Sequence, residues 1–175
     1  MNLPNQLTIL RVLLIPVFMV LLMNGYGLWA ALVFILASLT DALDGYLARK
    51  YELITNFGKI MDPLADKLLV TAALLCLCEL GQVASWMVFV ILAREFLISG
   101  LRAVAASQNI VIAASFWGKL KTVSQMTAVI FLLLENWPFS LWNLPVAQWL
   151  LWIAVILTII SGADYIIKSK DVFKG

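Results

Sequence analysis

The sequence contains no histidine among its 175 residues, and it contains only two cysteines. Without histidine, the chain lacks the commonest general base and most zinc-binding ligand sets. Cys76 and Cys78 lie two positions apart in an apolar run, so on a helix their side chains point in different directions. We therefore expect two small buried thiols that form neither a disulfide nor a metal site.

Charged residues are also scarce: they make up 13% of the chain, whereas hydrophobic residues make up 63%. A soluble domain has roughly a quarter charged and about half apolar residues. The mean hydropathy of +1.00 therefore indicates an integral membrane protein. No basic cluster with interleaved aromatic residues is present, so we expect no nucleic-acid partner.

Apolar residues occur in six runs that are long enough to form membrane-spanning helices. The predicted spans are residues 7–23, 28–39 (continuing as a helix to 49), 64–80, 83–106, 120–134 and 146–167. No internal repeat is visible, and little chain remains for a separate soluble domain. The sequence thus predicts an all-α, polytopic membrane protein with six transmembrane helices, in a single domain that covers residues 1–175.

Lysine and arginine are distributed unevenly between the two sides of these spans. The links at 24–28, 79–84 and 135–146 contain neither residue, whereas the link at 49–67, the segment after the fourth span and the C-terminal tail contain several. Because positive residues stay on the cytoplasmic side, both termini are expected to be cytoplasmic. We expect a multi-pass protein of the bacterial cell membrane.

Four aspartates lie between residues 41 and 66, beside long apolar runs. Asp41 and Asp44 are three residues apart, and Asp62 and Asp66 are four apart, so each pair shares a helical face. Carboxylates at the edge of a bilayer repel one another and are costly to desolvate unless cations bind them. Because no histidine or thiol is near, the sequence predicts a site for Mg²⁺ or Mn²⁺.

Small and basic residues accompany these aspartates. Gly45 and Ala48 share the face of Asp41 and would allow a flat group or another backbone to approach closely, while Arg49 lies just off it. Asp62 precedes Pro63, as an N-cap precedes a proline in the first helical turn. Helix packing, positive-inside placement and capping are the structural alternatives for these residues.

The whole stretch resembles the signature of the CDP-alcohol phosphotransferase family. The matching pattern is Asp41-x-x-Asp44-Gly45-x-x-Ala48-Arg49, eight residues, then Gly58-x-x-x-Asp62-x-x-x-Asp66. The resemblance implies a six-helix fold, and an enzyme that transfers a substituted phosphoryl group from a CDP-linked donor to an alcohol and releases CMP. It also implies a homodimer.

The resemblance further implies a role for each residue of the pattern. Asp41, Asp44 and Asp62 would hold one ion, and Asp41, Asp62 and Asp66 a second, with Asp66 also acting as the general base. The donor site would be formed by Asn5, Thr8 and Arg11 near the N-terminus and by Asp41, Gly45, Ala48, Arg49 and Gly58. Two divalent ions about 4 Å apart suit such a reaction, because they can clamp both the reacting phosphate and the departing CMP.

Four cations outside this pattern suggest the acceptor: Arg94, Arg102, Lys119 and Lys121. A cluster of this kind suits a phosphate dianion, such as that of glycerol 3-phosphate. Ala93-Arg94-Glu95-Phe96, Gly118-Lys119-x-Lys121-Thr122 and Asp164-Tyr165 are similar to the family branch that makes phosphatidylglycerophosphate from CDP-diacylglycerol and glycerol 3-phosphate. Gly118-Lys119-x-Lys121-Thr122 lacks the first glycine and the preceding strand of a Walker phosphate loop.

Other functions remain open at this level. The acceptor could be serine, an inositol phosphate or phosphatidylglycerol. A divalent-cation transporter would also bind metal through aspartates, but it requires polar groups that lead across the membrane. Here Glu79 and Glu135 lie at the opposite boundary, with no polar residues connecting them to the aspartates.

Overall fold

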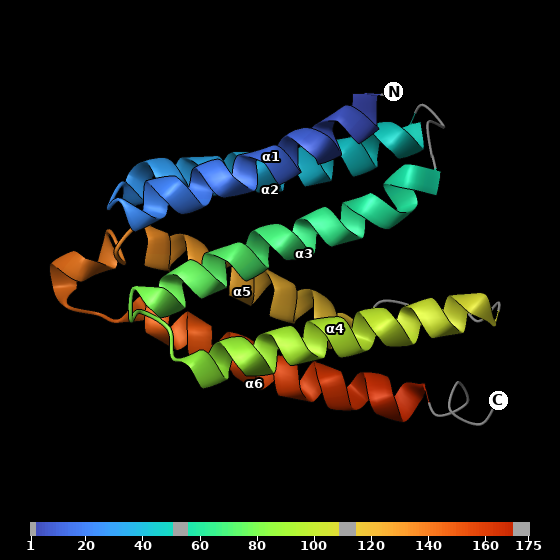
Figure 1. Cartoon of the computed structure of the whole chain (residues 1–175). Helices are drawn as coiled ribbons and strands as arrows, with labels where there is room; N and C mark the ends of the chain where they lie inside the picture. The colour runs from blue at the N-terminus through green and yellow to red at the C-terminus, as the bar shows by residue number, and fades with distance from the viewer. Residues whose placement is uncertain (1–2, 51–55, 109–114, 170–175) are drawn as a thin grey trace. The chain divides into compact units, whose positions relative to one another are not determined.

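The computed structural model describes residues 3–50, 56–108 and 115–169; within these ranges, the side chains of residues 3–4, 41–50, 56–57 and 59–60 lie outside the description. The described chain forms six α-helices and one short 3-10 helix, η1 (Figure 1). In order, these are α1 (Leu3–Met23), α2 (Gly27–Lys50), α3 (Asn56–Glu79), α4 (Ser85–Ser107), α5 (Phe116–Leu133), η1 (Phe139–Trp142) and α6 (Val146–Lys168).

The helices belong to two compact units. Unit 1 comprises Met1–Gln82 and Leu133–Glu135, and unit 2 comprises Val83–Leu132 and Asn136–Gly175. Unit 1 therefore contains α1, α2 and α3, whereas unit 2 contains α4, most of α5, η1 and α6. The prediction of a single domain over residues 1–175 stays a prediction.

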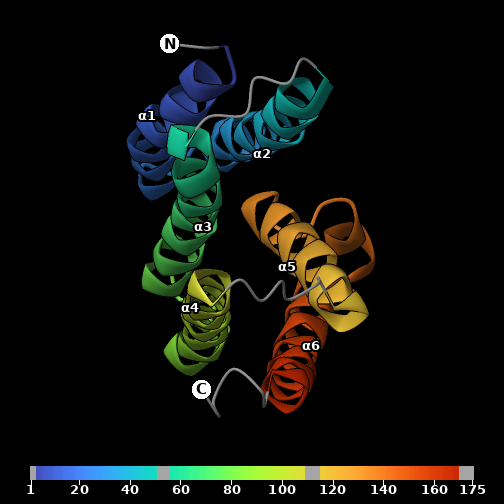
Figure 2. The ribbon, with the colours of Figure 1, turned by 90° about the vertical axis from the view of Figure 1, so that its right-hand side faces the viewer.

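In unit 1, α1 packs against both α2 and α3, which also contact each other (Figure 2). The rings of Phe18 on α1 and Phe34 on α2 lie 5.8 Å apart between centroids, and both side chains are fully buried. Small side chains allow the helix backbones to approach closely. The buried alanines of α2 and α3 are Ala30, Ala31, Ala37, Ala65, Ala72 and Ala73.

Glycine ends two of the unit 1 helices with the same backbone motif. Gly25, after α1, has φ of 82°, and Gly81, after α3, has φ of 72°. The following amides bond back by five residues, from Tyr26 N to the Leu21 carbonyl at 3.0 Å and from Gln82 N to the Leu77 carbonyl at 2.9 Å. Only glycine adopts this left-handed conformation without strain, so these two residues set where the helices end.

In unit 2, α4 packs along α6. Trp86, in the first turn of α4, contacts Trp152 of α6, with ring centroids 5.5 Å apart. Ile91 of α4 and Leu151 and Ala154 of α6 are fully buried. The opposite half of this unit, where α4 and α6 end and α5 begins, carries most of its described polar contacts.

All six predicted helices are present, but five of the six begin at a residue other than the first residue of the predicted span. α3 begins at Asn56, so Asp62 and Pro63 lie within the helix, and the interpretation of Asp62 as an N-cap is wrong. Helix α5 begins at Phe116, four residues before the predicted span 120–134. Cys76 and Cys78 are free thiols; Cys76 is buried, as expected, whereas Cys78 is partly exposed, so the prediction of two buried thiols is wrong for Cys78.

Two helices in the described part of the chain are long and apolar enough to cross a membrane: Asn5–Met23 within α1, and Val146–Lys168. The segment Gly27–Thr40 of α2 is apolar but shorter. The finding rests on length and composition, and it covers two of the six spans that the sequence predicts.

Candidate active site

The first two aspartates of the predicted metal site lie on the last three turns of α2. The helix is continuous from Gly27 to Lys50, so residues 41 and 44 share one helical face. The side chains of Asp41, Asp44, Gly45, Ala48 and Arg49 lie outside the described residues. Their predicted roles therefore remain predictions.

The other two aspartates lie one turn apart on α3, and both are half-buried. The hydroxyl of Thr8, on α1, donates a hydrogen bond of 2.6 Å to Oδ1 of Asp62. Thr8 is itself buried, with 1% of its surface exposed. A buried hydroxyl at this distance restricts the rotation of the carboxylate, which leaves the other oxygen, Oδ2, in a defined direction.

Arg11 lies one turn after Thr8 and is also buried, at 1% exposure. Its Nε donates a hydrogen bond of 3.2 Å to the carbonyl oxygen of Ala37 on α2. Ala37 is four residues before Asp41, so α1 is bonded to α2 just before the first aspartate and to α3 at the third. These bonds bring the N-terminal part of α1 beside the segments of α2 and α3 that carry the aspartates (Figure 1).

The remaining predicted donor-site residues of unit 1 lie in the same region. Asn5 is half-buried, one turn before Thr8, and Gly58 is buried, one turn before Asp62. Among the residues whose side chains are described, no three acidic, histidine or cysteine side chains gather to form a metal site. Two of the four predicted ligands, Asp41 and Asp44, lie outside that set.

The predicted acceptor cations all belong to unit 2, and three of them are bonded within it. Lys121 of α5 is buried, and its Nζ donates a hydrogen bond to Oε1 of Glu95 on α4. Arg94, also on α4, has its Nη1 3.6 Å from the same Glu95 oxygen. Lys121 is therefore a buried cation paired with a half-buried carboxylate, and a direct contact between Lys121 and a phosphate stays a prediction.

Tyr165, near the end of α6, contacts both arginines of α4. The guanidinium carbons of Arg94 and Arg102 lie 5.4 and 5.3 Å from the centre of its ring. Nη2 of Arg102 also donates a hydrogen bond of 2.5 Å to the tyrosine hydroxyl. Lys119, on α5, is exposed.

A second set of contacts ties the start of α5 to the end of α6. The backbone amide of Ser115 donates to the Tyr165 hydroxyl at 3.1 Å, and its side chain donates to Oδ2 of Asp164 at 2.6 Å. Lys168 forms an ion pair of 2.7 Å with Asp164. The sequence pattern includes Asp164 and Tyr165 but indicates no role for them, because their partners lie about 50 and 60 residues away.

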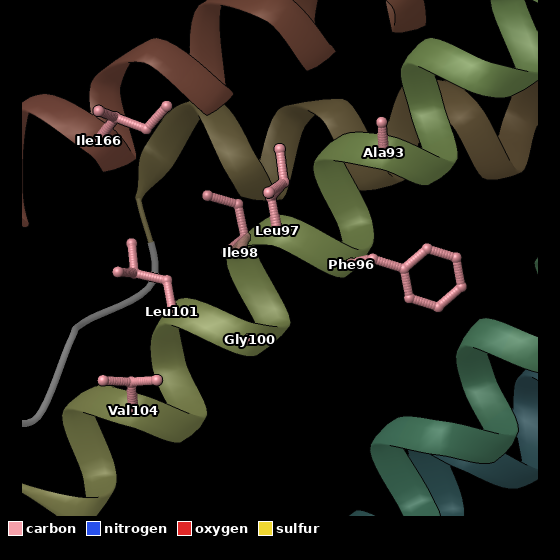
Figure 3. Close-up of a pocket in the computed structure, with 8 residues that line it drawn as sticks. All are labelled: Ala93, Phe96, Leu97, Ile98, Gly100, Leu101, Val104 and Ile166. Atoms are coloured by element: carbon pink, nitrogen blue, oxygen red, sulfur yellow. The ribbon is translucent and has the colours of Figure 1, made fainter.

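A groove of about 750 Å³ runs along α4 and is bounded by Ile166 of α6 (Figure 3). Its lining is apolar throughout: Ala93, Phe96, Leu97, Ile98, Gly100, Leu101, Val104 and Ile166. A nucleotide diphosphate requires charged or hydrogen-bonding partners when it leaves water. The groove therefore does not have the chemistry of the donor's head-group site.

Comparison with known proteins gives the family. Residues 1–160 match the family model of the CDP-alcohol phosphatidyltransferases. The chain belongs to this family. CDP-alcohol phosphatidyltransferases are membrane-associated and generally use divalent metal ions, which agrees with the composition and with an all-oxygen ligand set.

Several relatives that match along nearly their whole length share one name. The chain is 46% identical to a CDP-diacylglycerol–glycerol-3-phosphate 3-phosphatidyltransferase of Bacillus subtilis, over 99% of this chain and 97% of the relative. It is 45% identical to the protein of that name from Rickettsia typhi, over 98% and 99% of the two chains. The Haemophilus influenzae protein of that name is 41% identical, over 97% and 94%.

Proposed function

We propose that this protein transfers the phosphatidyl group of CDP-diacylglycerol to sn-glycerol 3-phosphate, giving phosphatidylglycerophosphate and CMP. The observation that carries the proposal is the identity of 41–46% along nearly the whole chain to relatives named for that activity. The complete aspartate signature supports the reaction class, and the arginines on Tyr165 support an anionic acceptor.

The aspartate set fits divalent metal ions. Four carboxylates without histidine or thiol are the ligands that Mg²⁺ and Mn²⁺ prefer, and Thr8 holds Asp62 in one orientation. Asp41, Asp44 and Asp62 would hold one ion, and Asp41, Asp62 and Asp66 the other. When bound, the two ions would neutralise charge on the diphosphate and stabilise the CMP leaving group.

The proposed reaction is a single displacement. The acceptor hydroxyl oxygen forms a bond to the phosphorus that carries the diacylglycerol, while the bond from that phosphorus to the CMP phosphate oxygen breaks. CMP leaves with the electron pair of that bond. Asp66 accepts the hydroxyl proton, so no covalent intermediate on serine or cysteine is required. The cytidine and diphosphate of the donor would be bound by Asn5, Arg11, Gly45, Ala48, Arg49 and Gly58.

The acceptor phosphate would be bound by Arg94, Arg102 and Lys119, with Lys121 either in direct contact or acting through Glu95. A phosphate dianion loses hydration near a bilayer, and fixed cations compensate for that loss. The proposal places both termini and the reaction on the cytoplasmic side, with all six helices crossing the membrane. It also includes assembly as a homodimer.

The test is product identification with purified protein in liposomes that contain CDP-diacylglycerol. Separate reactions receive glycerol 3-phosphate, serine, an inositol phosphate or phosphatidylglycerol, with Mg²⁺ or Mn²⁺, and the lipid product and CMP are measured by mass spectrometry. We expect phosphatidylglycerophosphate from the first reaction alone, and no product after chelation until metal is restored. Faster turnover with another acceptor would reject the proposed substrate, and full activity without metal would reject the two-ion site.

A further inference from the structure

Two like charges converge on one neutral side chain in unit 2. Arg94 and Arg102 are eight residues apart on α4, which separates their backbones by about 12 Å along the helix. Their guanidinium groups nevertheless lie at similar distances, 5.4 and 5.3 Å, from the centre of the same Tyr165 ring. Two cations repel each other, and the attraction to the tyrosine offsets this repulsion, together with the Glu95 carboxylate that lies 3.6 Å from Nη1 of Arg94.

The tyrosine supplies this attraction in two ways. The face of its ring attracts guanidinium groups, and the effect is stronger where water is excluded. Tyr165 is 4% exposed, so most of its ring is shielded from water. Its hydroxyl accepts hydrogen bonds from Arg102 and from the backbone amide of Ser115, which bonds the end of α6 to both α4 and the start of α5.

Because tyrosine is neutral, it holds the arginines without cancelling their charge. Unit 2 contains five cations but only two carboxylates in its described residues. Asp164 is paired with Lys168, and Glu95 is bonded to Lys121 and lies 3.6 Å from Nη1 of Arg94. Arg102 is bonded to a hydroxyl, and Nε of Arg94 is buried without a hydrogen-bond partner among the described residues. Arg94, Arg102 and Lys121 therefore share one carboxylate, and the group keeps an excess of positive charge.

Two glycines restrict the position of Arg94 from neighbouring helices. A Cβ atom at Gly118 of α5 would lie 3.2 Å from Nη2 of Arg94 and 3.5 Å from Cε2 of Tyr165. A Cβ atom at Gly162 of α6 would lie 3.4 Å from Cγ of Arg94. A side chain at Gly118 would therefore press on the guanidinium of Arg94, whereas one at Gly162 would reach ordinary contact with its stem.

We propose that Tyr165 is a positioning residue that holds Arg94 and Arg102 together as one binding site for a phosphate dianion, and that it thereby sets the affinity for the phosphorylated acceptor. The inference rests on the proposed function, because it identifies the dianion with the phosphate of glycerol 3-phosphate. It assigns Tyr165 no contact with the reacting atoms.

The first test compares Tyr165→Phe and Tyr165→Leu with the wild type in saturation curves for each substrate. The phenylalanine variant removes one hydroxyl and keeps the ring, so we expect the KM for glycerol 3-phosphate to rise roughly 3- to 10-fold. The leucine variant also removes the ring and should raise this KM further, roughly 10- to 100-fold. The KM for CDP-diacylglycerol should change less than about twofold in both. Tyr26→Phe, at an exposed turn residue, is the matched control and should change neither value.

The second test asks whether the hydroxyl acts through Arg102. In an Arg102→Gln background, Tyr165→Phe should raise the KM for glycerol 3-phosphate by much less than it does in the wild type, since the group that the hydroxyl holds is gone. Gly118→Ala should also raise this KM, because its methyl group displaces Arg94. Gly100→Ala is the control, since nothing lies within 4 Å of a Cβ atom there.

The outcomes separate this inference from the proposed function. If the wild type prefers an acceptor without a phosphate, the proposed function fails and the inference fails with it. If the wild type uses glycerol 3-phosphate but folded Tyr165→Phe leaves its KM unchanged, only the inference is overturned. Equal rises in both KM values, or full additivity with Arg102→Gln, would assign Tyr165 a purely structural role and also overturn it. Should Tyr165→Leu fail to fold, the phenylalanine and Gly118 variants decide the matter.

Discussion

At the scale of single residues, Asp62 and Asp66 show how neighbouring side chains can differ in role. Both lie on α3, one turn apart and half-buried. The proposed arrangement assigns Asp62 to both ions, whereas it assigns Asp66 to one ion and to the proton transfer. Removal of each charge should therefore have a different effect.

We expect Asp66→Asn to lower turnover more than it lowers donor binding. The substitution keeps the shape of the side chain but removes its basicity, and a general base contributes roughly 10²- to 10⁴-fold to the rate. Asp62→Asn should lower turnover and also weaken metal binding, because the two cations lose a negative ligand that they share. The measurements are kcat at saturating Mg²⁺ and the metal concentration for half-maximal activity. Near-normal kcat for Asp66→Asn would show that Asp66 is not the base.

The ion pair of Lys121 and Glu95 raises a separate question about a single residue. Lys121 is buried, whereas Glu95 is 23% exposed and also lies 3.6 Å from Nη1 of Arg94. Removing Lys121 alone leaves Glu95 with one cation fewer, whereas removing both charges of a pair is often close to neutral. We therefore expect Lys121→Gln to lower the thermal unfolding midpoint in detergent. The double variant, with Glu95→Gln, should recover most of that loss.

The saturation curve for glycerol 3-phosphate then decides the role of Lys121. If the double variant regains both stability and acceptor affinity, Lys121 acts through Glu95 and its neighbours. A variant that regains stability but keeps a high KM for the acceptor would instead assign Lys121 to direct phosphate contact, at roughly 1.5–3 kcal/mol for a charge-assisted bond.

At the scale of elements, α1 connects the two helices that carry the aspartates. Its bonds from Thr8 to Asp62 and from Arg11 to the carbonyl of Ala37 come from one face of the helix, since the two residues are three apart. An amphipathic membrane helix could pack through apolar side chains alone. These two polar contacts also fix the position of α1 along the axes of α2 and α3.

We expect Thr8→Val to lower the affinity for metal, and so to raise the Mg²⁺ concentration that half-maximal activity requires, without unfolding the protein. Valine has a similar shape but cannot donate to Asp62, and loss of a partner that orients a metal ligand typically costs 10- to 100-fold in metal affinity or activity. Thr8→Ser, which keeps the hydroxyl, is the matched control and should stay close to the wild type. The readout is the Mg²⁺ concentration for half-maximal activity. Equal values for the valine and serine variants would limit Thr8 to packing.

At the scale of the whole molecule, the placement of charge predicts how the chain crosses the membrane. The links without lysine and arginine should lie outside the cell, and the ends with the aspartates and Tyr165 should face the cytoplasm. Ser107, at the end of α4, and Ser140, in η1, are both exposed. The predicted topology places Ser107 on the cytoplasmic side of the membrane and Ser140 on the outer side.

These two serines allow a direct test. In a background with Cys76→Ala and Cys78→Ala, S107C and S140C each introduce a single thiol. A membrane-impermeant maleimide applied to intact cells should label the S140C variant at once, and the S107C variant only after the membrane is permeabilised. The reverse pattern would invert the topology, and labelling of both in intact cells would contradict an odd number of spans between them.

The sequence by itself determined the elements and the chemistry. Apolar runs predicted six helices, and the spacing of four aspartates predicted shared helical faces, because helical periodicity is local and needs no tertiary information. The predicted third span begins at residue 64, where the apolar run begins, whereas α3 begins at Asn56, because hydropathy identifies the apolar part of a helix and not the polar turns before it.

Only the tertiary structure decided which side chains act together. The hydrogen bond from Thr8 to Asp62 joins residues 54 apart, and that from Arg102 to Tyr165 joins residues 63 apart. No local pattern encodes such a contact, because it depends on how whole helices pack. The same packing pairs Lys121 with Glu95 and places Arg94 and Arg102 against the ring of Tyr165. The sequence alone does not distinguish the four predicted acceptor cations, whereas the structure gives them different partners.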